Sequence, residues 1–88
     1  LKGRAVLVVD PDESVRSDAH RLLERYGCIV ETAHTGCEAV SLARCTHYDA
    51  ILVDIRLPDM SGYELLCRLQ DVLEDGVPMV LMTGYGYD

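Results

Sequence analysis

Acidic or hydroxyl side chains directly follow three apolar runs of the sequence. Asp10 follows the first run, Asp54 the third and Thr83 the fourth. Each alone would be an ordinary turn residue, but a fold that gathers all three would bring several oxygens together. Carboxylates at close range repel each other unless a cation neutralises them, and an oxygen-rich cluster suits Mg²⁺, which commonly partners phosphate. The residue types therefore indicate phosphoryl transfer with a carboxylate as nucleophile.

The elements around these residues predict a sheet that gathers them. Continuous apolar, β-branched runs predict buried strands over residues 4–9, 28–32, 48–53 and 78–82. Helical spacing of apolar residues predicts helices over residues 15–26, from 36 to about 46, and from 62 to 73. Strands that alternate with such helices form a parallel α/β sheet covered on both faces. Ligands of these sheets bind outside the carboxyl ends of the strands, where the polar residues above fall.

Local signals mark the helix ends. Thr35-Gly-Cys-Glu38 and Ser61-Gly-Tyr-Glu64 are capping boxes, in which the hydroxyl accepts from a free N–H and the glutamate reaches back. Gly27 and Gly76 stand where a glycine ends a helix, after the first and the third helical patterns.

Composition excludes several classes of protein. The chain has 88 residues, 49% of them hydrophobic, which suits one small globular domain and argues against disorder. No apolar run approaches the roughly 20 residues of a membrane span, so we expect no membrane insertion. A net charge of −7 without Phe or Trp disfavours direct nucleic-acid binding. The four cysteines lack C-x-x-C spacing, and we expect small buried side chains in a reducing, cytoplasmic environment.

Three motifs resemble the receiver domain of two-component response regulators. They are Val-Leu-Val-Val-Asp10, Leu-Val-Asp54-Ile-Arg-Leu-Pro-Asp-Met-Ser-Gly-Tyr-Glu64 and Val-Leu-Met-Thr83-Gly. The resemblance covers all 88 residues, and the Leu-Pro-Asp-Met-Ser-Gly loop is its most specific part. It implies a flavodoxin-like, doubly wound parallel sheet with the strand order 2-1-3-4-5, as in chemotaxis regulators. The last strand and helices of that pattern would fall beyond Asp88.

The resemblance also implies a role for each matching residue. Asp54 would be the phosphoacceptor, taking a phosphoryl group from a phosphohistidine on a histidine kinase or a phosphotransfer domain. Mg²⁺ would be held by Asp10, Asp54 and the backbone carbonyl of Arg56. Thr83 would bond a phosphoryl oxygen and swing inward on modification. Arg56 and Tyr85 would occupy two variable positions that tune the lifetime of the phosphoryl group.

The sequence departs from the family pattern in two places. The second of two adjacent acids that usually bind the metal is replaced by Pro11, which has no side-chain oxygen. Asp12, one residue further along, is the candidate substitute ligand because Pro11 fixes the local backbone. The family's lysine and switch aromatic belong to a region beyond Asp88.

Three functions remain open on these residues. The first is a signalling phosphoacceptor rather than an enzyme, within either a separate response regulator or a hybrid histidine kinase. Its partners would be the phosphohistidine donor, an effector domain or a second copy. The second is a degenerate receiver-like interaction domain that works without phosphorylation, which Pro11 suggests. The third is a haloacid-dehalogenase-like phosphatase with Asp10 as nucleophile and Asp12 as acid/base.

The predicted elements also imply an uncovered face. A fourth strand without a fifth beside it would be an exposed edge, and the first helix would lack a packing neighbour. We therefore expect residues 1–88 to be the N-terminal two-thirds to three-quarters of a receiver domain, or another molecule to cover that edge.

Overall fold

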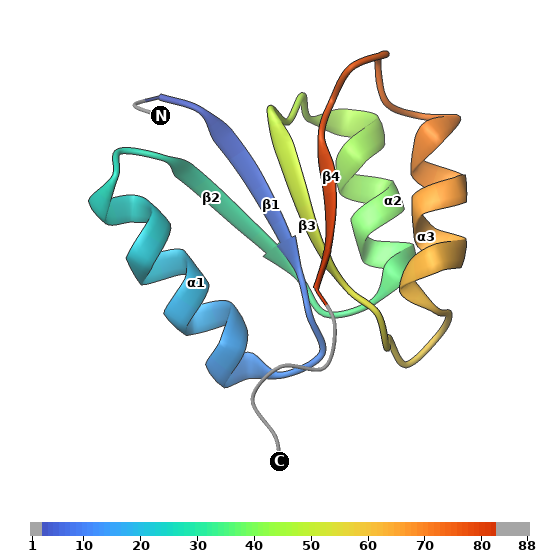
Figure 1. Ribbon diagram of the computed structural model, residues 1–88, viewed down its shortest axis with the longest axis horizontal. Coiled ribbons are helices and arrows are strands. Elements are labelled where there is room, and N and C mark those ends of the chain that lie inside the picture. The colour runs from blue at the N-terminus through green and yellow to red at the C-terminus, as the bar shows by residue number, and fades with distance from the viewer. Residues whose placement is uncertain (1–2, 83–88) are drawn as a thin grey trace.

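The chain alternates strands and helices. A computed structural model describes residues 3–82 (Figure 1). Its elements, in chain order, are β1 (Ala5–Val9), α1 (Glu13–Arg25), β2 (Ile29–Ala33), α2 (Gly36–Cys45), β3 (Ala50–Asp54), α3 (Gly62–Gln70) and β4 (Met79–Met82). The predicted order of elements is confirmed, and each predicted strand and helix is found.

The four strands form one parallel sheet in the order β2-β1-β3-β4. Helix α1 lies on one face of the sheet, and α2 and α3 lie side by side on the other (Figure 1). In the register, Val9 pairs with Ala33 on β2 and with Val53 on β3, so these strands end at one edge. The predicted doubly wound α/β fold is therefore confirmed, including the family's strand order for these four strands.

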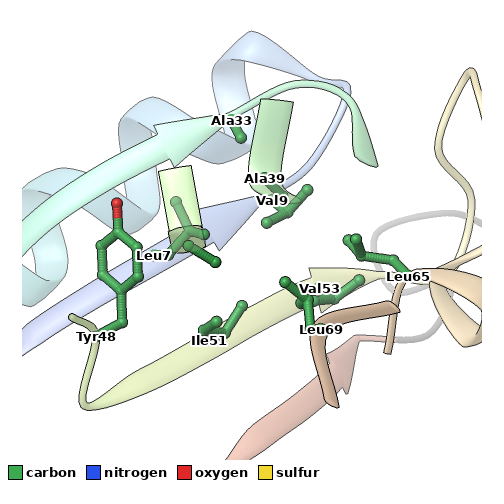
Figure 2. Close-up of a cluster of buried hydrophobic side chains, with 10 residues drawn as sticks. Leu7, Val9, Ala33, Ala39, Tyr48, Ile51, Val53, Leu65 and Leu69 are labelled. Atoms are coloured by element: carbon green, nitrogen blue, oxygen red, sulfur yellow. The ribbon is translucent and has the colours of Figure 1, made fainter. Parts of the chain in front are cut away.

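Strand β1 supplies side chains to both faces of the sheet. Leu7 and Val9 belong to the cluster on the side of α2 and α3, while Val6 and Val8 pack on the side of α1. Figure 2 shows the larger cluster, whose labelled members are Leu7, Val9, Ala33, Ala39, Tyr48, Ile51, Val53, Leu65 and Leu69. Each large apolar side chain buried there contributes about 1.5–3 kcal/mol. This core fixes the strand ends that carry the polar residues.

The ends of α1 follow from local chemistry. Gly27 adopts a φ of +85°, which only glycine takes without strain, and its N–H donates to the Glu24 carbonyl at 2.9 Å. The Cys28 N–H donates to the Leu23 carbonyl at 3.2 Å. The predicted glycine stop is confirmed.

The two capping boxes are only half formed. Thr35 Oγ1 and Ser61 Oγ each accept a hydrogen bond of 3.1 Å, from the N–H of Glu38 and Glu64 respectively. The prediction that each glutamate also reaches back to the N–H of its cap residue is wrong for both helices. The Glu38 carboxylate accepts from the His34 N–H at 3.0 Å, one residue further out, and Glu64 bonds Arg68 at 2.7 Å.

Helix α3 is shorter than predicted. It ends at Gln70, because the N–H groups of Asp71 and Val72 donate to carbonyls three residues back, which tightens the final turn. Val72 and Leu73 still pack against the core, so the apolar pattern continues past the helix itself. Gly76 lies in the following turn at a φ of +91° and does not end α3.

Three of the four cysteines are exposed, contrary to the expectation that all are buried. Cys28 is buried just before β2, whereas Cys37, Cys45 and Cys67 lie on the solvent-facing sides of α2 and α3. A small residue in an apolar-periodic segment can fall just outside the buried stripe of a helix. None of these four cysteines, all of which lie within residues 3–82, forms a disulfide.

The edge formed by β4 is uncovered in the described part of the chain. Val80 on β4 is 49% exposed, and Leu22 on α1 is 52% exposed. Helix α1 has no buried residue of its own. The expected exposed edge and partly unpartnered first helix are therefore confirmed for residues 3–82. Within this range no helix combines the length and apolar character that a membrane crossing requires.

Candidate functional site

Asp10 lies at the carboxyl end of β1 and is held by three hydrogen bonds. Its N–H donates to the Ala33 carbonyl at 3.0 Å, which extends the pairing with β2. Its carbonyl accepts from Arg16 Nη1 at 2.7 Å, and its Oδ1 accepts from the Asp12 N–H at 2.8 Å. Only 4% of the residue is exposed. Asp10 is thus a fixed, buried carboxylate rather than a free turn residue.

Asp54 is the last residue of β3 and is half-buried. Because β1 and β3 are neighbours, its carboxylate lies near that of Asp10. Burial raises the pKa of Asp10 above its ordinary value of 3.8, and the negative charge of Asp54 raises this pKa further. The bond from the Asp12 N–H opposes both effects and lowers the pKa. Two carboxylates therefore share one sheet edge at a cost in electrostatic energy.

The loop after β3 is closed by a close approach between the backbones of its two ends. The Gly62 N–H donates to the Ile55 carbonyl at 2.8 Å. A Cβ on Gly62 would lie 2.5 Å from the Asp54 carbonyl oxygen and 2.9 Å from the Ile55 Cα. Gly62 therefore lets α3 start directly against the end of β3. Its position in the Leu-Pro-Asp-Met-Ser-Gly loop was the only sequence signal for this role.

Arg56 lies in that loop, opposite Ser61 in an isolated antiparallel bridge. The two bonds of the bridge join Gly62 to Ile55 at 2.8 Å and Leu57 to Met60 at 3.2 Å. Arg56 and Ser61 are therefore a non-hydrogen-bonded pair, and the bridge does not use the Arg56 carbonyl. This carbonyl is an oxygen that a cation could share with the carboxylates.

Asp12, the candidate substitute ligand, uses one carboxylate oxygen to cap α1. It is the N-cap of α1, and its Oδ1 accepts from the Ser14 N–H at 2.8 Å. Pro11 and Asp12 are both exposed. Among residues 3–82, no three acidic, histidine or cysteine side chains form a group able to hold a metal. The structure thus brings Asp10 and Asp54 together but places the Asp12 carboxylate on the helix backbone.

Thr83 and Tyr85 lie outside the described residues. The prediction of a hydroxyl switch at Thr83 and of a variable flanking position at Tyr85 therefore stays a prediction.

Two further residues shape the site, and the sequence reasoning missed both. Arg16 reaches back from α1 to the Asp10 carbonyl, and its positive charge lowers the pKa of Asp10. Asp59 accepts from the N–H groups of Gly36 and Cys37 at 2.8 and 2.9 Å, and these bonds lower its pKa to about 2. Arg16 lies only six residues after Asp10, near the start of the next helix, so the sequence separation allowed this contact. No local sequence pattern connects Asp59 to α2.

The oxygen donors at this edge fit a hard divalent cation. Asp10 and Asp54 supply carboxylates, and Arg56 supplies a backbone carbonyl, the ligand types that Mg²⁺ prefers. A cation would also relieve the repulsion that raises the pKa of Asp10. Two side chains with one carbonyl leave several positions for water, which Mg²⁺ usually keeps.

Comparisons with known proteins agree with this geometry. A family model of the response regulator receiver domain matches residues 6–88. Histidine kinase 3 of Arabidopsis thaliana is 37% identical over 76 residues, which is 85% of this chain and 7% of that protein. Response regulator MprA of Mycobacterium ulcerans is 36% identical over 78 residues, which is 89% of this chain and 33% of that protein. The chain thus spans about a third or less of these relatives.

Solved structures show the same fold. A CheY-like receiver domain protein from Methanospirillum hungatei superimposes with a TM-score of 0.90 at 31% identity, covering 98% of this chain and 68% of that one. A response regulator protein from Burkholderia pseudomallei, solved with a phosphorylated aspartic acid, a calcium ion and citrate, gives a TM-score of 0.86 at 35% identity. That match covers 94% of this chain and 48% of the other. With its parallel sheet, its paired strand-end aspartates and a family match over nearly its whole length, this chain belongs to the response regulator receiver domain family.

Proposed function

We propose that Asp54 accepts a phosphoryl group from a phosphohistidine on a histidine kinase or phosphotransfer domain. The observation that supports this most is the placement of Asp54 beside Asp10, whose buried carboxylate has a raised pKa. A buried carboxylate with a raised pKa beside a second carboxylate is typical of a functional site. The Burkholderia pseudomallei relative, which carries a phosphorylated aspartic acid and a calcium ion, supports the same chemistry.

The residues divide the transfer between them. An Asp54 carboxylate oxygen attacks the phosphorus while the bond from phosphorus to the donor imidazole nitrogen breaks, which leaves an acyl phosphate on Asp54 and a histidine on the donor. Mg²⁺, when bound, would offset the charge on the transferring oxygens. Asp10 and the Arg56 carbonyl would hold that ion, and the Thr83 hydroxyl would bond a phosphoryl oxygen. Arg56 and Tyr85 would set how long the acyl phosphate survives.

Phosphoryl labelling tests the proposal. The whole protein is incubated with Mg²⁺ and either acetyl phosphate or a phosphohistidine donor, and the modified residue is identified by mass spectrometry. We expect label on Asp54 that is lost in Asp54→Asn and strongly reduced in Asp10→Asn. Persistent labelling of the Asp54→Asn variant would overturn the assignment. Label on Asp10 would instead favour the phosphatase hypothesis, which the family match leaves without support.

A second function is favoured by one specific observation. Pro11 lacks a ligand oxygen, and Asp12, the nearest acid, caps α1. A receiver with this site could act as a phosphorylation-independent interaction domain. Calorimetric titration with Mg²⁺ separates the two functions, because binding of Mg²⁺ at this site would contradict the second.

Residues 1–88 would form part of a longer protein. We infer that residues 1–88 are the N-terminal two-thirds to three-quarters of a receiver domain, because the Val80 edge and the Leu22 side of α1 are uncovered in the described residues. The parent protein would be a cytoplasmic response regulator or a hybrid histidine kinase, and the output would pass to an effector domain or to a second copy. The net charge of −7 makes this segment a poor direct partner for nucleic acid.

A further inference from the structure

The loop between β3 and α3 is joined to the start of α2 by one carboxylate. Asp59 Oδ1 accepts from the Gly36 N–H at 2.8 Å, and Oδ2 accepts from the Cys37 N–H at 2.9 Å. These donors are at the first turn of α2, where N–H groups have no partner within the helix. Both carboxylate oxygens are therefore committed to α2, 22 or more residues away in the sequence.

The next residue strengthens the same junction. Met60 packs so closely on Gly36 that a Cβ there would lie 2.5 Å from the Met60 sulfur. Gly36 is buried, so its missing side chain leaves the space that Met60 fills. Asp59 and Met60 thus fix the tip of the loop by hydrogen bonds and by packing.

The fixed tip lies three residues from Arg56. Between them, the Leu57 N–H donates to the Met60 carbonyl at 3.2 Å, and Arg56 lies opposite Ser61. At the loop's far end, Gly62 packs directly on the backbone of Asp54 and Ile55. The loop is therefore held at its tip and at the junction where Gly62 closes it, and the Arg56 carbonyl has little freedom to move.

We propose that Asp59 is a positioning residue that presets the Arg56 carbonyl for the divalent cation by anchoring the β3–α3 loop to the N-terminus of α2. This inference rests on the proposed function, because it takes Arg56 as a cation ligand. It also implies a reciprocal effect. A cation that prefers the anchored loop stabilises the anchor, so cation binding strengthens the bonds at Gly36 and Cys37.

The test compares two variants of the whole protein. Asp59→Asn keeps the shape of the side chain but sets an NH₂ group against one of the two N–H donors. Glu64→Gln is the control: it removes the same single negative charge at the start of α3, where the Glu64 carboxylate bonds only Arg68 among the described residues. Amide hydrogen exchange and Mg²⁺ titration, both followed by NMR, are measured for each variant.

We expect Asp59→Asn to speed exchange at Gly36, Cys37 and Leu57 without Mg²⁺, and to weaken Mg²⁺ binding by about tenfold, the lower end of what loss of an outer support costs a metal site. Glu64→Gln should resemble the wild type in both measurements. In the wild type, Mg²⁺ should slow exchange at Gly36 and Cys37.

The outcomes separate the two proposals. Unchanged Mg²⁺ affinity in Asp59→Asn, beside a wild type that binds the ion and labels on Asp54, would overturn the positioning role alone. Equal losses of affinity in both variants would overturn it too, since a general charge effect would then suffice. A wild type that neither binds Mg²⁺ nor takes label would overturn the proposed function, and the role of Asp59 toward a cation with it.

Discussion

The Asp12 N–H donates a 2.8 Å hydrogen bond to Oδ1 of Asp10, across the intervening Pro11. The Asp12 carboxylate then turns the other way and caps α1 at the Ser14 N–H. One residue thus supports the buried acid and starts the helix. Because Asp12 Oδ1 satisfies a helix donor, only Oδ2 of Asp12 is left to take the place of the acid that Pro11 displaces.

The buried carboxylate of Asp10 should destabilise the folded protein, in exchange for its role in binding a cation. Replacing Asp10 by Asn removes a buried negative charge beside Asp54, while the amide oxygen still accepts from the Asp12 N–H. We expect Asp10→Asn to raise the unfolding free energy at neutral pH by on the order of 1 kcal/mol and to abolish Mg²⁺ binding. Since the raised pKa makes ionised Asp10 unfavourable in the fold, the gain should vanish as pH falls toward 3.8. Urea titrations at several pH values check this, and a destabilised variant at pH 7 would contradict it.

Restoring the missing acid should strengthen the cation site. In Pro11→Asp a third carboxylate joins Asp10 and Asp54, and we expect about a tenfold gain in Mg²⁺ affinity, equal to roughly 1.4 kcal/mol. Asp12→Asn is the matched control, because asparagine caps helices as well as aspartate does. Its Mg²⁺ affinity should match that of the wild type. A large loss in Asp12→Asn would show that Asp12 is a ligand after all.

Much of this site could be predicted from the sequence, for a topological reason. Asp10 and Asp54 directly follow apolar runs, and parallel strands bring their carboxyl ends to one edge. Short-range patterns were enough to locate the strands, and the strands were enough to bring the two carboxylates together. The hydroxyls of Thr35 and Ser61 were predictable as caps on the same basis, because a cap bonds only two or three residues away.

The features that could not be predicted depend on contacts between distant segments, or on which of several possible partners a side chain bonds. Asp59 bonds N–H groups on another helix, and no local pattern identifies that partner. Glu38 bonds the His34 N–H and Glu64 bonds Arg68, so neither glutamate bonds its cap residue. The end of α3 was misplaced because Val72 and Leu73 stay apolar for the core after the helix stops. At this end of α3, the apolar spacing indicates burial rather than helical backbone.

The Asp59 bonds should appear in the acid stability of the protein. The two N–H donors lower the pKa of Asp59 from 3.8 to about 2. A lowered pKa contributes stability that is fully present above about pH 4 and is lost as pH falls toward 2. We therefore expect the difference in unfolding free energy between wild type and Asp59→Asn to shrink over that interval. Thermal unfolding at stepwise pH measures it, and a constant difference from pH 5 to pH 2 would refute the assignment.

At alkaline pH, the stability of the protein should depend on Tyr48. Its hydroxyl bonds the Glu31 carboxylate, and burial together with this bond raises its pKa from 10.0 to about 12. The folded protein then keeps a proton that the unfolded chain releases, so stability falls as pH rises from 10 to 12. Tyr48→Phe should cost about 1 kcal/mol at pH 7 and lose less on alkaline titration. Parallel alkaline unfolding curves for the two proteins would contradict this.

Two glycines that begin helices should respond differently to the same substitution. Gly62 follows the Ser61 cap and Gly36 follows the Thr35 cap, so Ala at either position is the first helical residue. At Gly62 the new methyl group would meet rigid backbone, including the Asp54 carbonyl oxygen at 2.5 Å. We expect Gly62→Ala to cost about 1–3 kcal/mol and to slow phosphoryl labelling. At Gly36 the obstacle is only the flexible Met60 side chain, so Gly36→Ala should cost less than about 1 kcal/mol, helped by the helix propensity of alanine, and should slow labelling less than Gly62→Ala does. Chemical denaturation and labelling rates test both, and equal costs would show that β3 and α3 do not approach as closely as their backbones indicate.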